Sequence, residues 1–263
     1  MNKRFLHALL CASLASPVAV SAQTAAPAAT SSGPSITATA TAVSQYMFRG
    51  QRLGGLSFQP AVEAGLGDGV LGLWSNFPIK DEVPDTSDPE LDVYGSYRFA
   101  VGDAISISPG FTWYVYPDAP TDLGFYRSTF EPNLALSYAV LGLQLTPKIY
   151  YDFTLEGPTY ELTAAYALPL AAWGTELNFT ATVGSFLIKD ASKGSDPSTK
   201  AWGDYWLVGV SVPVQVSSSG KLVIGLAFTE GKNAFFKQGS AGKSPNSLAV
   251  GRAVVTLSYS HSF

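Results

Sequence analysis

The stretch from Leu141 to Leu155, LGLQLTPKIYYDFTL, alternates apolar and polar residues at every second position. Its odd-numbered residues are all apolar, whereas its even-numbered residues include Gln144, Lys148 and Asp152. A repeat of two places successive side chains on opposite faces of an extended chain. The stretch therefore predicts a β-strand with one apolar face and one polar face.

The same period of two recurs along most of the chain from Ile36 onward, and no long stretch shows the helical period of 3.6. Tight turns alternate with longer polar connections, although the connections near 52–56 and 156–158 are short. We expect about twelve strands, at residues 36–51, 57–66, 70–77, 90–100, 104–116, 125–138, 141–155, 159–168, 175–188, 201–215, 221–229 and 248–263.

The composition points to a membrane protein without membrane helices. Of 263 residues, 46% are hydrophobic and only 14% are charged, against about 25% charged in a soluble domain. Beyond the first two dozen residues, no apolar run approaches the roughly 20 residues that a transmembrane helix needs. The net charge of −4 provides no basic surface for nucleic acid.

The N-terminus has the features of a secretory signal. Lys3 and Arg4 precede an apolar segment, and Val20-Ser21-Ala22 offers a small-x-small cleavage pattern. We expect residues 1–22 to be a signal peptide, residues 23–35 a flexible lead-in and residues 36–263 a single domain. Cleavage would remove Cys11, the only cysteine, and with it any disulfide or thiolate metal site.

Two all-β architectures fit the alternation. A secreted sandwich hides its apolar faces and needs a charged exterior, whereas a barrel in lipid turns its apolar face outward. The low charge, the even strand count and the terminal Phe263 favour the barrel. We therefore predict an antiparallel transmembrane β-barrel in the bacterial outer membrane, in contact with lipid and lipopolysaccharide and inserted by the barrel-assembly machinery, which would read the last strand.

Charged residues on the strands fall almost entirely on the polar face. The predicted pore-lining residues are Arg49, Glu63, Asp92, Arg98, Arg127, Glu131, Lys148, Asp152, Glu161 and Arg252. A tight turn after Tyr138 would pair residues whose numbers sum to about 279, which sets Arg127 opposite Asp152 and Glu131 opposite Lys148. Such pairs either brace the lumen or form a constriction that selects solutes.

Aromatic residues gather near the predicted strand ends, where amphipathic rings favour the headgroup level of the membrane. We interpret them as interface girdles, with a sugar-binding aromatic slide inside the lumen as the alternative. The residues concerned are Trp74, Trp113, Tyr114, Tyr116, Tyr126, Tyr138, Tyr151, Trp173, Trp202 and Tyr259.

Catalytic chemistry has little support in the sequence. The only histidines are His7, in the signal segment, and His261, on the apolar face of the last strand, so no nucleophile has a histidine base. We predict no catalytic residue, no metal and no cofactor. An acidic cluster on a long loop is interpreted as solvated, with binding of calcium or lipopolysaccharide as the alternative; its members are Asp81, Glu82, Asp85, Asp88 and Glu90.

Four segments of the first strands resemble the TorF family of outer-membrane porins. The matching segments are Tyr46-Met47-Phe48-Arg49-Gly50, Pro60-Ala61-Val62, Gly72-Leu73-Trp74-Ser75-Asn76 and Glu90-Leu91-Asp92-Val93-Tyr94-Gly95-Ser96-Tyr97. Where that family tends to continue with Ser-Gln, this chain has Gln51-Arg52. The resemblance implies a porin-like role without naming a substrate, and it places Arg49 and Asp92 in the lumen.

Together these features predict a passive channel for small polar solutes. The alternative is a closed barrel that serves as a structural or surface-binding protein through its extracellular loops. Both functions use the same lumen charges, so the two predictions differ only in whether the lumen is open.

Overall fold

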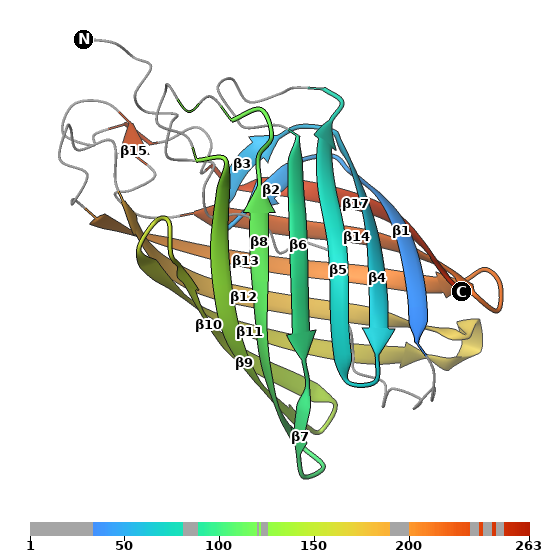
Figure 1. The fold of residues 1–263 in the computed structure, drawn as a ribbon. Coiled ribbons are helices and arrows are strands. Elements are labelled where there is room, and N and C mark those ends of the chain that lie inside the picture. Colours follow the sequence, from blue (N-terminus) through green and yellow to red (C-terminus); the bar gives the residue numbers. More distant parts are fainter. Residues whose placement is uncertain are drawn as a thin grey trace.

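Twelve antiparallel strands close into a barrel in the computed structural model of the chain (Figure 1). The ring closes where the first barrel strand, β1, pairs with the last, β17; strand β6 pairs with β8, and a short segment, β7, continues the β6 strand along β8. The barrel strands are β1 (Ser35–Val43), β4 (Ser57–Leu66), β5 (Gly69–Pro78), β6 (Glu90–Tyr97) with β7 (Phe99–Val101), β8 (Ile105–Val115), β9 (Ser128–Val140), β10 (Leu143–Asp152), β11 (Gly157–Leu170), β12 (Thr175–Lys189), β13 (Lys200–Gln215), β14 (Gly220–Gly231) and β17 (Arg252–Ser262).

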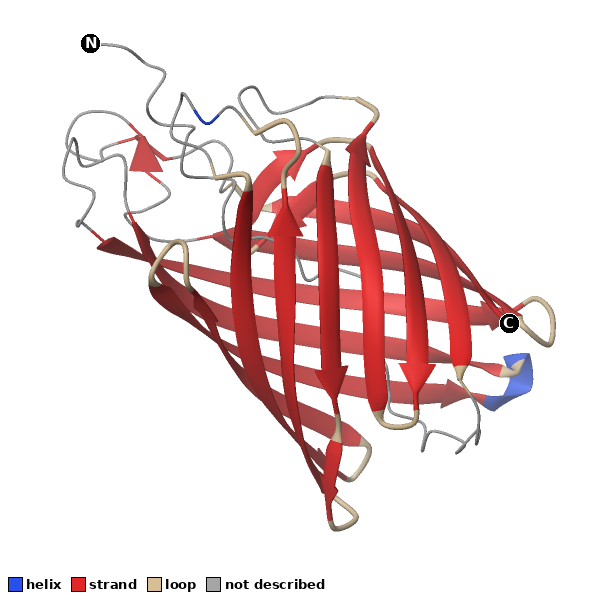
Figure 2. Ribbon diagram, viewed as in Figure 1, coloured by secondary structure: helices blue, strands red, loops and turns tan. Residues whose placement is uncertain are grey.

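Within the part of the chain that the structure describes, a few short elements lie outside the barrel (Figure 2). The additional elements are the hairpin strands β2 (Tyr46–Phe48) and β3 (Gln51–Gly54), the paired strands β15 (Lys237–Gln238) and β16 (Ser244–Pro245), and the 3-10 turn η3 (Ala171–Trp173). Among the described residues, no helix has the length and apolar character needed to span a bilayer.

The structure describes residues 34–80, 89–119, 121, 126–189, 200–231, 237–238, 244–245 and 250–263. The predicted signal peptide, all but the end of the predicted lead-in, and Asp81, Glu82, Asp85 and Asp88 of the predicted acidic cluster lie outside these residues.

The two ends of the barrel differ in their connections. One end carries the short turns, such as the one between β4 and β5 at residues 67–68, together with the start of β1 and the end of β17: Phe263 donates its backbone N–H to Ile36 at 2.9 Å. The other end carries the longer connections. Short periplasmic turns and longer extracellular loops are typical of outer-membrane barrels, so we call the two ends periplasmic and extracellular.

Side chains alternate between lipid and lumen along every barrel strand. On β10 the odd-numbered Ile149 and Tyr151 point outward and are exposed, whereas Tyr150 and Asp152 point inward and are buried. The apolar outer face has no protein partner, which suits contact with lipid. The predicted fold class and the strand count of twelve are confirmed.

The predicted strand at residues 36–51 is wrong after Val43. Strand β1 ends there, and residues 44–56 do not continue along the barrel wall but contain the β2–β3 hairpin. The hairpin is buried on both faces, from Tyr46 through Gln51. The sequence pattern missed it because a segment buried on both faces shows no alternation to mark its end.

The predicted register between β9 and β10 is also wrong. Leu143 pairs with Val140, so paired numbers sum to 283 rather than 279. The turn lies at Leu141 and Gly142, which have φ of 50° and 81°, the two positive angles of a type I′ hairpin turn. Lys148 therefore pairs with Ala135 on β9 and with Glu161 on β11, and not with Glu131.

We expect an arginine on the lipid face to destabilise the barrel. Val183 lies near the middle of β12 and is 56% exposed, so Val183→Arg should cost about 2–4 kcal/mol of unfolding free energy measured in lipid vesicles. Thr182→Arg is the matched control, because the neighbouring side chain faces the lumen and bonds with Thr163. An equal loss for both variants would contradict the assignment of the outer face.

Candidate functional site: the lumen hairpin and the polar cavity

The β2–β3 hairpin folds into the extracellular half of the lumen. Phe48 pairs with Gln51 across a two-residue turn formed by Arg49 and Gly50, whose φ angles are 42° and 76°. Positive φ at both turn positions is the type I′ geometry that suits tight hairpins. The turn carries the Arg49 side chain inward, where it is buried.

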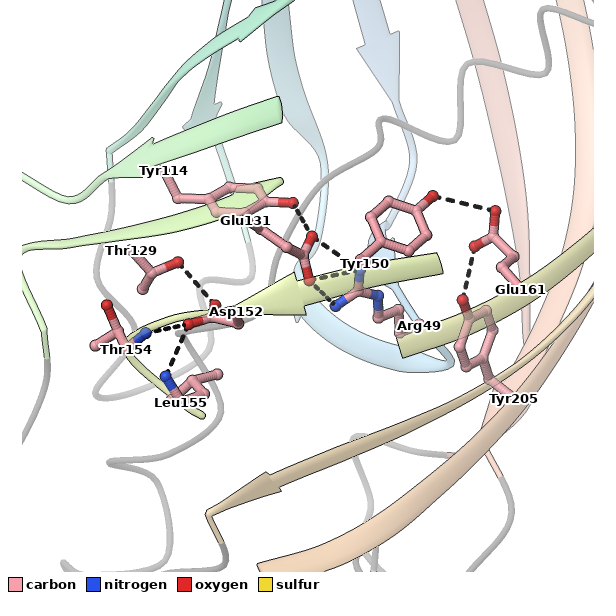
Figure 3. Close-up of polar contacts among 10 residues, drawn as sticks. All are labelled: Arg49, Tyr114, Thr129, Glu131, Tyr150, Asp152, Thr154, Leu155, Glu161 and Tyr205. Carbon is pink, nitrogen blue, oxygen red and sulfur yellow. Dashed lines mark hydrogen bonds and ion pairs between the residues drawn. The ribbon is translucent and has the colours of Figure 1, made fainter. Parts of the chain in front are cut away.

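The tip of the hairpin is bound to the opposite wall of the barrel. The Arg49 guanidinium donates through Nη1 and Nη2 to the carboxylate of Glu131, with all three N–O distances 3.0 Å (Figure 3). Glu131 lies on β9, five strands from β1 in the shorter direction around the ring. A contact between walls so far apart has to cross the lumen, so the hairpin obstructs the passage at this level.

Two aromatic rings also stabilise the positive charge of Arg49. Its guanidinium lies 4.7 Å from the ring centre of Phe48 and 5.0 Å from that of Tyr150, within the range of cation–π attraction. Burial on its own lowers the pKa of Arg49, but the nearby Glu131 carboxylate and three tyrosines raise it, and the net pKa lies above its ordinary value. Arg49 is therefore a fixed positive charge.

Tyrosine hydroxyls satisfy the buried carboxylates around the hairpin. Tyr114 donates to Glu131 at 2.9 Å, while Tyr46 and Tyr116 donate to the two oxygens of Glu90 at 2.7 and 3.1 Å. Buried carboxylates are costly unless such donors are present. The hairpin and its surroundings also form an apolar cluster of Tyr46, Phe48, Leu53, Trp74, Tyr114, Tyr116 and Ala119.

A second polar group lies on β10 and β11, beside the ion pair. Glu161 accepts hydrogen bonds from Tyr205 at 2.7 Å and from Tyr150 at 3.3 Å (Figure 3). The Lys148 ammonium lies 4.5 Å from the ring centre of Tyr150. The constriction thus combines two cations and two carboxylates, linked through the ring of Tyr150.

Asp152 is hydrogen-bonded by neighbouring groups and not by the predicted partner, Arg127. It accepts hydrogen bonds from the Thr129 hydroxyl at 2.9 Å and from the backbone N–H groups of Thr154 and Leu155 at 2.8 and 2.7 Å. These bonds order the short connection between β10 and β11. The predicted pairing of Arg127 with Asp152 is therefore wrong.

The other predicted pore-lining residues lie at different heights. Asp92 is buried on β6, Glu63 is half-buried on β4, and Arg252 begins β17 at the extracellular end. Arg127 is exposed at the extracellular rim, just before β9. The Arg98 side chain is 49% exposed at the periplasmic rim and lies 3.8 Å from Asp68.

A polar cavity of about 540 Å³ lies in the lumen between the hairpin and the periplasmic end. Trp74 bounds the cavity near the hairpin. The centre of its ring lies 5.8 Å from the centre of the Tyr46 ring. Ser219 and Ser262 bound the cavity at the periplasmic end. Its lining is rich in hydroxyl groups, so it can hold water and polar solutes.

Several residues of this site were not predicted. Trp74, Tyr114 and Tyr116 were assigned to the interface girdles, but they are buried in the lumen, whereas six others of that set are exposed outside: Trp113, Tyr138, Tyr151, Trp173, Trp202 and Tyr259. Glu90 was assigned to the acidic loop, but it is the buried first residue of β6. The alternation of β8 could have identified the two tyrosines, because its even-numbered side chains face the lumen and Tyr114 and Tyr116, the latter directly after the strand, continue that series.

Metal binding finds no support in the described part of the chain, where no group of three or more His, Cys, Asp or Glu side chains is placed to hold an ion. The carboxylates of the constriction are instead occupied by arginine and tyrosine donors. The arrangement can position charge and narrow a passage.

A closed antiparallel barrel with an apolar exterior and a polar lumen defines a bacterial outer-membrane β-barrel. The chain belongs to a family described as a bacterial protein of unknown function (Gcw_chp), whose model matches residues 27–261. No curated protein matches the chain.

Two solved porins have a similar fold. The NanC porin is 10% identical with a TM-score of 0.53, and the alignment covers 86% of this chain and 98% of that one. The KdgM porin, solved in complex with disordered oligogalacturonate, is 11% identical with a TM-score of 0.51, and the alignment covers 87% of this chain and 99% of that one. At this identity, the likeness concerns the fold.

We expect the Arg49–Glu131 ion pair to be strongly coupled. Arg49→Met leaves the Glu131 carboxylate buried beside Tyr114, so it should cost about 3–5 kcal/mol of unfolding free energy in a denaturant titration. The double variant Arg49→Met/Glu131→Leu should lose much less, because it buries no uncompensated charge.

The control for this pair is Arg98→Met, which breaks the exposed ion pair with Asp68 and should change the unfolding free energy by less than about 1 kcal/mol. If the losses from Arg49→Met and Glu131→Leu simply add in the double variant, the two side chains are not coupled and the proposed anchoring of the hairpin is wrong.

Gly50 should be required for docking of the hairpin. A Cβ there would lie 2.6 Å from the Cα and N atoms of Gly231 on the barrel wall, whereas a Cβ at Gly67 meets nothing within 4 Å. Both glycines have positive φ, so Gly67→Ala measures the conformational cost alone, about 1–2 kcal/mol.

We expect Gly50→Ala to exceed that loss and to expose Arg52 to trypsin. Limited proteolysis of the folded barrel would show the cleavage. Equal stability losses and equal protection for the two alanine variants would contradict close packing at the tip.

Proposed function

We propose that the protein is an outer-membrane channel for passive diffusion of small polar solutes, with the β2–β3 hairpin as its constriction. The observation that carries the proposal is the polar cavity inside the barrel, which is separated from the extracellular end by this hairpin. A barrel that serves only as a membrane anchor has no need of a water-filled, hydroxyl-lined lumen. The fold shared with NanC and KdgM and the resemblance to TorF porins support the same conclusion.

The charged residues divide into two roles under this proposal. The lumen residues act on the passing solute or shape its path: Arg49, Glu63, Asp92, Glu131, Lys148, Asp152, Glu161 and Arg252. Arg98 and Arg127 stand at the two rims, where they meet a solute on entry or exit. The proposal assigns no catalytic role to any residue.

A second function is favoured by one specific observation. The hairpin packs into a buried apolar cluster inside the barrel, and such packing would suit a permanently closed barrel that binds partners through its loops. The two functions differ in a single property, the ability of the folded barrel to pass ions.

Two partners follow from the position of the barrel in the membrane. The exposed side chain of Phe263 ends β17 at the periplasmic rim, which supports recognition of this strand by the barrel-assembly machinery. The exposed Arg127 at the extracellular rim is suited to the phosphate groups of lipopolysaccharide.

Planar bilayer recordings test the channel. The purified full-length barrel should give discrete conductance steps, and replacement of residues 45–55 by Asn-Gly, a two-residue turn, should enlarge them because the obstruction is removed. Glu131→Gln, which weakens the anchor of Arg49, should give an intermediate increase or frequent switching between levels.

Folding of each variant is checked by its heat-modifiable migration in gel electrophoresis. A folded barrel without conductance, both with the hairpin and without it, would overturn the channel in favour of the closed barrel. Conductance that is unchanged by removal of residues 45–55 would show that the hairpin is not the constriction.

A further inference from the structure

The polar cavity has a composition that suits a ligand with many hydroxyl groups. Hydroxyl side chains from the neighbouring strands β1 and β17 form one wall, and two cross-strand pairs bond directly, Thr37 with Ser262 at 3.0 Å and Thr41 with Ser258 at 2.9 Å. Each hydroxyl both donates and accepts hydrogen bonds. Such a wall can exchange its internal bonds for bonds to a ligand hydroxyl at little cost.

The cavity carries almost no net charge. Among the described residues that line it, the charged side chains are Glu63 and Lys221, which have opposite signs. Glu63 also accepts a hydrogen bond from the Tyr94 hydroxyl at 2.8 Å. A ligand with a single charge would be attracted by one of these two side chains and repelled by the other, so the two effects offset each other, whereas a neutral polar ligand needs only hydrogen-bonding partners.

Tyr94 provides a fixed aromatic surface at the edge of the cavity. Its cross-strand partner is Gly72, and a Cβ on that glycine would lie only 2.3 Å from the Tyr94 Cζ atom. The ring therefore lies against the barrel wall in the space that a side chain would otherwise occupy, with its hydroxyl held by Glu63. Its remaining face is available to the lumen, since the residue is only half-buried.

This combination matches the two kinds of surface on a sugar ring. The C–H groups on one face of a pyranose are attracted to the negative face of an aromatic ring, and the hydroxyl groups at its edge bond with carboxylate, amide and hydroxyl partners. Glu63 lies beside Tyr94, and the amide of Gln59 lies on the same inward parity of β4. The volume of about 540 Å³ is within the range of small-ligand sites.

We infer that the cavity is a binding site for a neutral sugar, with Tyr94 as the stacking surface and Glu63 as the hydrogen-bonding partner of the sugar hydroxyls. The inference rests on the proposed channel function and names its solute class. The sugar would bind on the periplasmic side of the Arg49–Glu131 constriction, so that the constriction and the site act in sequence on a passing solute.

Two measurements with the full-length barrel test this inference, with maltose as the neutral probe. Isothermal titration in a detergent without a sugar headgroup should show binding of maltose, and maltose should produce reversible current blocks in planar bilayers. Galacturonate, an anionic sugar acid, and glucosamine, a cationic amino sugar, should bind about tenfold more weakly, because each loses hydration of its charge and meets both an attracting and a repelling side chain in Glu63 and Lys221.

Variants assign the effect to the proposed residues. Tyr94→Leu should weaken maltose binding by about threefold to tenfold through loss of the aromatic face, and Tyr94→Phe, which keeps the ring, should retain most of the affinity. Tyr138→Leu is the matched control, because it makes the same change on the lipid face and should leave binding unchanged.

The outcomes separate the inference from the channel proposal. Conductance without maltose binding, or tighter binding of either charged sugar, would overturn the neutral-sugar site and leave the channel intact. Maltose binding by a folded barrel that never conducts would support the site and overturn the channel. Equal losses for Tyr94→Leu and Tyr138→Leu would show that the ring does not contact the sugar.

Discussion

The structure depends on one constraint: a backbone in lipid has to satisfy all of its hydrogen bonds internally. Closure of the sheet through β1 and β17 meets this constraint and leaves no free edge in the barrel. Closure with twelve strands also creates an interior wider than the eight-stranded case, which wall side chains just fill. The hairpin and its buried ion pair fill one part of that interior, and the polar cavity is the part that stays open.

Strand periodicity predicted much of the fold and only part of the site. It identified the strands and the inward faces that carry Glu131, Lys148 and Asp152, because each barrel strand has lipid on one side and lumen on the other. It could not set the β9–β10 register, since the change of the paired sum from 279 to 283 shifts each residue's partner by four positions, an even number, and leaves every side chain on its own face.

The hairpin is the element that periodicity could not show. Residues 46–48 are buried on both sides, and the contact between Arg49 and Glu131 joins residues 82 positions apart. The resemblance of this segment to the TorF motif implied that Arg49 is a lumen residue, whereas the period-two pattern placed it on a strand at residues 36–51. Only the closed barrel brings its guanidinium to the carboxylate of Glu131, because neither residue type nor spacing specifies a partner across the lumen.

The position of the hairpin between β1 and β4 has a consequence for assembly. Strand β1 pairs with β17, so the ring cannot close until the last strand has been made, and contacts between distant parts of a chain form late because of their entropic cost. The tip of the hairpin lies against both Glu131 on β9 and Gly231 on β14, so its docking depends on strands far apart in the chain. We expect docking of the hairpin, and with it the obstruction of the lumen, to come late in folding.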